Sequence, residues 1–139
     1  MTVDLTQLHP DLLPLCNEFL NQLTDAIAPS TAKVIFTYRD PITQDALYAQ
    51  GRTTPGKIVT DLTSTSSKHC FTLDGVPAAK AFDIAVFNPD GSYVAYGDDL
   101  RYQHAGALWK VLSTTNINLG LVWGGDWTQP HDCDHFQIA

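Results

Sequence analysis

One acidic residue inside an apolar stretch limits the possible folds of this chain more than any other feature of the sequence. Residues 81–87 are apolar except for Asp83, which stands between Phe82 and Ile84, and this pattern predicts a β-strand. Burying an unpaired carboxylate is costly, because water no longer solvates its charge. Asp83 therefore has to form an ion pair, bind a metal ion, or lie on an exposed face of the strand.

The C-terminal segment, residues 124–137, is the richest source of partners for such an acid. Within ten positions it carries two histidines, His131 and His135, and the carboxylates of Asp126, Asp132 and Asp134. Imidazole and carboxylate groups are ligands of first-row metal ions, and hydrolytic zinc sites typically use three protein ligands and one water. An acid–base group must stand close to that water. The segment therefore favours a metal-dependent hydrolase.

His69 offers a further imidazole, after a loop rich in Ser and Thr. By itself it is more often a loop histidine than a ligand. The set His69, Asp83 and His135 is a stronger signal, because it supplies two histidines and one aspartate and leaves Asp132 as a spare carboxylate. His131 could be a ligand on helical spacing, but Pro130 disfavours a helix there.

Composition and charge exclude several classes of protein. The 139 residues form one predicted domain, 1–139, whose N-terminal segment 1–30 is helical. A net charge of −7 argues against nucleic acid or an anionic membrane as partner. No stretch approaches the roughly 20 apolar residues of a membrane helix, so we expect no membrane insertion. We also expect a monomer. The first residues lack the features of a signal peptide, so we expect export to need outside help.

Hydrophobic periodicity and turn residues predict an α+β fold with a small, mainly antiparallel sheet and flanking helices. Asp40 and Pro41 suit the start of a short helix, and Asp98 or Asp99 the start of a longer one. The predicted helices cover residues 12–27, 41–50 and about 100–112, and the predicted strands cover residues 33–39, 81–87, 93–96, 119–123 and 136–138. In the first of these strands, Val34, Phe36 and Tyr38 are predicted to share one face.

Several motifs make the chain similar to a known family. They are Tyr38-Arg39, Gln44, 47–53 (LYAQGRT), 55–60 (PGKIVT), Ser67-Lys68-His69, 81–84 (AFDI), 123–127 (WGGDW) and 132–137 (DCDHFQ). With them the chain resembles the LAS group of zinc peptidases, named for lysostaphin, D-alanyl-D-alanine carboxypeptidases and the hedgehog proteins. It looks closest to the L-alanyl-D-glutamate endopeptidases of phage endolysins and bacterial wall hydrolases.

The resemblance implies a hedgehog- or D,D-peptidase-like fold and a set of roles. His69, Asp83 and His135 would bind Zn²⁺ and leave a position for water. Asp132 would take a proton from that water and pass it to the leaving amine. Arg39 would stabilise the oxyanion of the tetrahedral intermediate.

Substrate contacts are weaker predictions. Ser67 and Gln44 are candidates by resemblance, although capping and helix-surface roles suit them equally. His131 is predicted at the rim of the site, and Trp127 in its wall or in the core.

Two departures from the family pattern bear on the site. The connection between His69 and Asp83 is longer than usual, which makes Asp74 an alternative ligand. The extra residues could lie at the edge of the cleft and select substrates, or form a surface excursion without function. Asp134 stands where the family commonly has proline, and this second acid could raise one of the two carboxyl pKa values.

The resulting expectation is a zinc-dependent, bacteriolytic endolysin that cuts the peptidoglycan stem peptide between L-Ala and D-Glu. It would be made in the bacterial cytoplasm and reach the cell wall through a holin. D-alanyl-D-alanine carboxypeptidase action is the alternative within the family. Outside that reaction class, the alternatives are a non-catalytic, hedgehog-like zinc-binding domain and a Cys–His hydrolase that uses Cys70 or Cys133.

Overall fold

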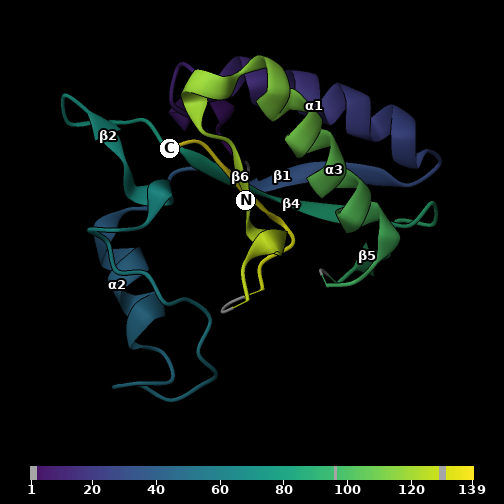
Figure 1. Cartoon of the computed structure of the whole chain (residues 1–139). Coiled ribbons are helices and arrows are strands. Elements are labelled where there is room, and N and C mark those ends of the chain that lie inside the picture. Colours follow the sequence, from purple (N-terminus) through teal and green to yellow (C-terminus); the bar gives the residue numbers. More distant parts are fainter. Residues whose placement is uncertain (1–2, 96, 129–130) are drawn as a thin grey trace.

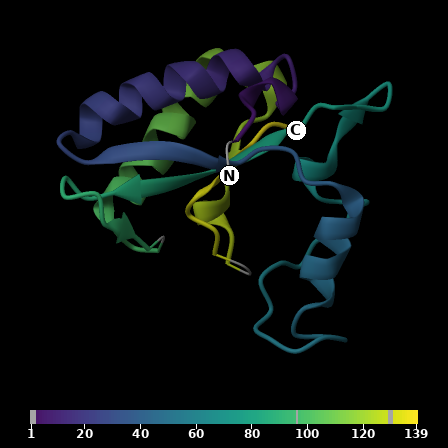
Figure 2. The ribbon, with the colours of Figure 1, turned by 180° about the vertical axis from the view of Figure 1, so that it is seen from behind.

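The protein is described here by a computed structural model, which covers residues 3–95, 97–128 and 131–139. Helices α1 (Leu12–Ile27) and α3 (Leu100–Thr115) lie side by side against one face of a five-stranded sheet. Helix α2 (Pro41–Ala49) lies apart from them, on the other side of the sheet, as Figures 1 and 2 show from opposite directions. The predicted α+β class is confirmed.

The sheet is antiparallel throughout, with β4 as its central strand. Its order is β1-β4-β7-β6, and β5 also pairs with β4. The strands are β1 (Thr31–Phe36), β4 (Ala81–Phe87), β5 (Tyr93–Val94), β6 (Val122–Trp123) and β7 (His135–Gln137). Strand β4 is buried along almost its whole length, which is why its sequence is continuously apolar except at Asp83.

The helices begin where the sequence predicts. Asp40 caps α2, because its carboxylate accepts a hydrogen bond from the backbone N–H of Thr43 at 2.9 Å. Asp99 caps α3 in the same way through Arg101. Helix α1 buries its apolar stripe and ends at Ile27, ahead of Pro29. No helix of the described residues is long and apolar enough to span a membrane.

The core lies between the two long helices and the sheet, around a cluster of four aromatic rings. Phe19 of α1 and Trp109 of α3 meet edge to face, with 5.4 Å between ring centroids. Phe82 and Phe136 stack on each other at 5.5 Å across β4 and β7. Because side chains alternate along a strand, the neighbours of these two phenylalanines face the other side of the sheet.

Strand boundaries near the edges of the sheet differ from the prediction. Residues 117–119 form a 3₁₀ helix, so β6 is shorter than the predicted strand 119–123. Strand β5 ends at Val94, and Tyr96 of the predicted strand 93–96 lies outside the described residues. The last strand begins one residue earlier than predicted, which places His135 inside it.

A bulge in β1 corrects the predicted facing of its side chains. Val34 pairs with Ile84 and Phe36 with Asp83, so Ile35 is the extra residue. The prediction that Val34 and Phe36 share one face is therefore wrong. Val34 packs against the core, whereas Phe36 is 48% exposed and lies on the Asp83 side of the sheet.

The additional residues between His69 and Asp83 form a small hairpin of β2 (Thr72–Leu73) and β3 (Val76–Pro77). Its turn uses Asp74 at φ 51° and Gly75 at φ 79°, a left-handed conformation that suits these two residue types. Two backbone bonds close its base: Ala78 N–H donates to the Phe71 carbonyl, and Lys80 N–H to the Lys68 carbonyl. The chain therefore returns beside His69 just before β4 begins.

Candidate metal centre

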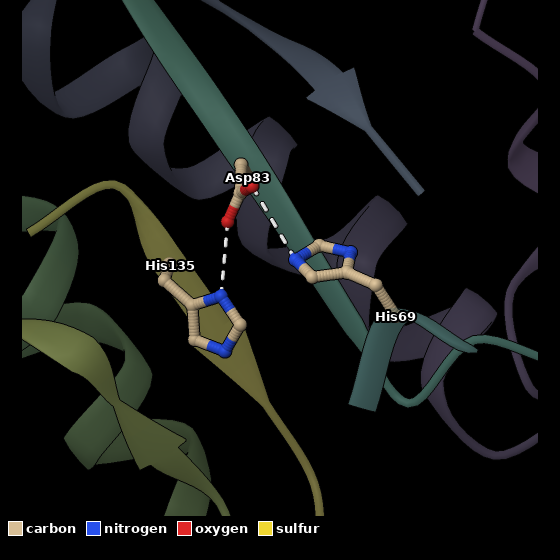
Figure 3. Close-up of side chains that lie close together, drawn as sticks. All are labelled: His69, Asp83 and His135. Atoms are coloured by element: carbon tan, nitrogen blue, oxygen red, sulfur yellow. Dashed lines mark hydrogen bonds and ion pairs between the residues drawn. The ribbon is translucent and has the colours of Figure 1, made fainter. Parts of the chain in front are cut away.

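Two of the three predicted ligands come from directly paired positions on neighbouring strands. Asp83 on β4 is opposite His135 on β7. Phe82 and Phe136 point into the core, so Asp83 and His135 point to the face that α1 and α3 leave uncovered. Asp83 Oδ1 lies 3.0 Å from His135 Nδ1 (Figure 3).

The third predicted ligand, His69, lies in a short 3₁₀ helix, Lys68–Cys70. The Ser67 hydroxyl caps this turn by accepting from the His69 backbone N–H. His69 Nε2 lies 3.3 Å from Asp83 Oδ2, on the side of the carboxylate away from His135 (Figure 3). Its Nδ1–H donates to the Thr37 carbonyl at 2.7 Å. That bond leaves the Nε2 lone pair of His69 directed at the site.

This cluster fits a divalent metal ion. One ligand atom from each of His69, Asp83 and His135 lies within 4.8 Å of the others, and all three residues are buried. Burial alone would favour a neutral Asp83, but His69 and His135 hold the pKa of this carboxyl well below its usual value. Two imidazoles and one carboxylate are the ligand types of hydrolytic zinc sites, with a position left for water. The alternative ligand, Asp74, lies in the hairpin turn and outside this cluster.

Two further carboxylates stand beside the cluster. Asp132 Oδ2 lies 4.0 Å from His135 Nδ1, and the Asp132 side chain is 31% exposed. Asp134 is buried, and burial together with the nearby Asp132 and Asp83 raises the pKa of Asp134 to about 9. Asp134 is therefore protonated at neutral pH, in line with the predicted effect of a second acid here, while Asp132 has access to water.

A cavity of about 560 Å³ opens over the cluster. It is lined on one side by the sheet and on the other by α2 and residues 59–62 and 66–68. Of the predicted site residues, the lining includes His69, Asp83, Asp132, His135, Arg39, Gln44, Ser67 and Trp127. A flexible peptide could therefore reach the cluster from solvent.

Arg39 is fixed in the cavity wall by Gln44. The Arg39 guanidinium donates to Gln44 Oε1 at 2.9 Å and lies 5.2 Å from the ring centroid of Phe36. Gln44 is 1% exposed, and its amide donates to the Leu62 carbonyl at 2.7 Å. Both polar ends of Gln44 are therefore occupied by protein, so it holds Arg39 and the 60–62 loop together.

Of the two remaining candidates, Trp127 lines the cavity and His131 does not. The ring centroids of Trp127 and His135 are 5.0 Å apart, and Trp127 forms part of the cavity wall. His131 lies outside the cavity lining. One of its ring nitrogens is 3.1 Å from the Trp127 carbonyl and the other 2.9 Å from the Cys133 sulfur.

The cysteines are poorly suited to nucleophilic chemistry. Cys133 is fully buried, and burial raises the pKa of its thiol. Burial likewise raises the pKa of Cys70. A thiol that stays protonated is a weak nucleophile, so the pairing of Cys133 with His131 does not favour a Cys–His hydrolase.

Phe36, Thr37 and Gln137 contact predicted site residues but received no role from the sequence. Phe36 reaches the cavity only because of the bulge, which no local pattern reveals. Thr37 acts through its backbone carbonyl, so its side-chain type carries no signal. Gln137 Oε1 lies 2.8 Å from His135 Nε2, and its place two residues after His135 on a strand is the signal that points to it.

Comparison with known proteins agrees with this geometry. Residues 62–138 match the family model described as D-alanyl-D-alanine carboxypeptidase, of the M15 peptidases. The peptidoglycan L-alanyl-D-glutamate endopeptidase CwlK of Bacillus subtilis (strain 168) is 32% identical over 133 residues, which cover 92% of this chain and 74% of that protein. The chain therefore belongs to the D-alanyl-D-alanine carboxypeptidase (M15) family of peptidases, as the motifs predicted.

A solved structure shares the fold. The crystal structure of the Serratia marcescens L-Ala D-Glu endopeptidase ChiX superposes with a TM-score of 0.63 at 19% sequence identity. The match covers 97% of this chain and 83% of that chain. The peptidase fold predicted from the motifs is thereby confirmed.

Proposed function

We propose that this protein is a zinc-dependent peptidoglycan hydrolase that cleaves the L-alanyl–D-glutamate bond of the stem peptide. The observation that carries the proposal is the buried set of His69, Asp83 and His135 at the base of an open cavity, in a member of a peptidase family. The bond is inferred from CwlK, which is named for this cleavage and aligns with nearly the whole chain.

The metal ion would be held by His69 Nε2, His135 Nδ1 and the Asp83 carboxylate. These are the atoms that face one another across the cluster. When bound, zinc would lower the pKa of a coordinated water from 15.7 towards about 7 and polarise the scissile carbonyl. Strands β4 and β7 hold two of these ligands in register, so little rearrangement is required.

Asp132 is the proposed acid–base residue. It is close to His135 yet retains access to the cavity, so its carboxylate can take a proton from the attacking water and return it to the leaving amine. Burial and the nearby Asp132 and Asp83 raise the pKa of Asp134, so Asp132, which is 31% exposed, is the better candidate of these two acids for proton transfer.

Arg39 is the proposed oxyanion donor. Gln44 fixes its guanidinium in the wall of the cavity, so a donor is already oriented before the substrate arrives. Preorganised donors stabilise a developing oxyanion without reorganisation during the reaction. Ser67 and Trp127 line the same cavity and are proposed to contact the stem peptide. His131 lies outside the lining, so we propose no substrate contact for it.

The test is mass analysis of peptidoglycan fragments after digestion with the purified, zinc-loaded protein. L-alanyl-D-glutamate endopeptidase action would release peptides that begin with D-Glu and leave L-Ala on the glycan. D-alanyl-D-alanine carboxypeptidase action, the second candidate because of the family model's description, would instead shorten pentapeptides by one D-Ala. Intact peptidoglycan with the zinc-loaded protein would contradict both and leave the non-catalytic zinc-binding domain.

A further inference from the structure

Gln137 occupies a special position relative to the metal cluster. It follows His135 by two residues on β7, so both side chains lie on the same face of the sheet. Gln137 Oε1 lies 2.8 Å from His135 Nε2. Figure 3 shows that this second ring nitrogen points away from Asp83. The His135 ring therefore lies between two acceptors, the Asp83 carboxylate on one side and the Gln137 amide on the other.

We propose that Gln137 is a positioning residue for the metal centre: its Oε1 accepts a hydrogen bond from His135 Nε2–H and so reserves Nδ1 of His135 for the ion. This inference rests on the metal site of the proposed function. It adds a residue whose side chain acts on the ion only through a ligand.

The chemistry of a neutral imidazole explains why such an acceptor is required. The ring has one N–H and one lone pair, and only the nitrogen with the lone pair binds a metal ion. An acceptor at Nε2 stabilises the tautomer whose lone pair is on Nδ1, the atom that faces Asp83 and His69. It also opposes a ring flip, which would direct the wrong atom at the site.

His69 has an equivalent arrangement with the opposite ring atoms. Its Nδ1–H donates to the Thr37 carbonyl at 2.7 Å, which leaves Nε2 directed at Asp83. Each histidine of the cluster thus has a hydrogen-bond acceptor at the ring nitrogen that does not face Asp83. The acceptor of His69 is backbone and survives side-chain substitution, whereas the acceptor of His135 is a side chain and can be removed by one mutation.

A purely structural role for Gln137 is less consistent with its contacts. Among the residues that the structure describes, its side chain hydrogen-bonds only to His135. It is half-buried and lines the cavity, outside the apolar core. Its backbone pairs with Ala81 and Val122, and these strand contacts do not depend on the side chain.

The experiment compares the zinc dissociation constants of three variants with that of the unchanged protein, by competition with a chromogenic chelator. Gln137→Met keeps the length of the side chain but removes the acceptor, and should weaken zinc binding roughly 10–100-fold. Gln137→Glu keeps an acceptor and should restore binding to within a few-fold. The matched control is Gln103→Met, since Gln103 is also half-buried and its amide donates to the Gly97 carbonyl away from the cavity.

A second measurement addresses the tautomer directly. In ¹⁵N-labelled, zinc-loaded protein, NMR correlation of the His135 ring should show the proton on Nε2 and the ion on Nδ1. This readout uses the unchanged sequence, so it remains decisive if Gln137→Met fails to fold.

The outcomes separate this inference from the proposed function. If the unchanged protein binds no zinc, both the proposed metal site and the role of Gln137 are refuted. If zinc binds with equal affinity to the unchanged protein and Gln137→Met, or if the ion lies on Nε2 of His135, the site stands and the role of Gln137 is refuted. The role of Gln137 is supported if Gln137→Met binds zinc more weakly than the unchanged protein, while Gln137→Glu and Gln103→Met bind zinc with nearly unchanged affinity.

Discussion

Asp83 and His135 are directly opposed residues on the antiparallel strands β4 and β7, and Asp83 Oδ1 lies 3.0 Å from His135 Nδ1. The spacing of these two groups is therefore set by strand pairing inside the sheet. Only His69 approaches from outside the sheet, on a short 3₁₀ helix capped by Ser67. Strand pairing consequently sets most of the geometry of the proposed metal site.

We expect His135→Ala to lose zinc without unfolding. The variant removes one of the three proposed ligands, whereas the core residues Phe82 and Phe136 on the opposite face of the sheet are untouched. Metal analysis after dialysis should give about one zinc per chain in the unchanged protein and almost none in the variant, with similar far-UV circular dichroism. His104→Ala, at an exposed position on α3, should retain zinc. Full zinc content in His135→Ala would remove His135 from the site.

Asp132→Asn should keep zinc and the fold but lose turnover. The amide has nearly the same shape but cannot accept the proton of the attacking water, so kcat should fall by on the order of 10²–10⁴-fold. Steady-state cleavage of a purified stem peptide measures this change. Asp126→Asn is the control, because Asp126 lies near the same segment but pairs with Lys110 on the surface. Comparable kcat values for the two variants would exclude Asp132 as the acid–base residue.

Arg39→Ala should lower kcat by roughly 10²-fold, with a smaller change in KM, because the oxyanion exists only after attack on the carbonyl. The matched control is Lys33→Ala, which removes an exposed positive charge from β1, outside the cavity lining. If only KM rises in Arg39→Ala, the guanidinium binds the ground state, and the oxyanion role is incorrect.

Shortening the hairpin between His69 and Asp83 should leave both zinc binding and substrate preference unchanged. Residues 72–77 lie outside the lining of the cavity, and the bonds from Ala78 to Phe71 and from Lys80 to Lys68 close the base of the hairpin. We would replace 72–77 with a two-residue Asn-Gly turn and measure kcat/KM on several stem peptides. A changed order of preference among these peptides would show that the hairpin contributes to selectivity after all.

Gly106→Ala should destabilise the protein, although alanine favours a helix over glycine by about 1 kcal/mol. A Cβ at this position on α3 would lie 2.5 Å from the Trp123 ring, which is held in place by a hydrogen bond to the Cys133 carbonyl. Overpacking of this kind typically costs about 1–3 kcal/mol. Urea unfolding measures the change, with His104→Ala as an exposed control on the same helix. A gain in stability would mean that helix and ring can separate freely.

The sequence by itself determined the elements whose signals are local. The apolar stripe of α1, the Asp40 and Asp99 caps and the apolar run of β4 each depend on residues close in the chain, and all appear as predicted. The motifs likewise identified the family and selected the three residues that the structure brings together, His69, Asp83 and His135.

Only the tertiary structure decided how side chains face one another across long separations. The β1 bulge, which turns Phe36 to the cavity, depends on its register with β4. Gln44 holds Arg39 because α2 packs beside the 60–62 loop. His131 directs a ring nitrogen at the Cys133 sulfur, whereas its neighbour in the sequence, Asp132, lines the cavity. The bulge and the loop packing depend on contacts between segments that are distant in the sequence, and the pattern of neighbouring residues does not specify those contacts.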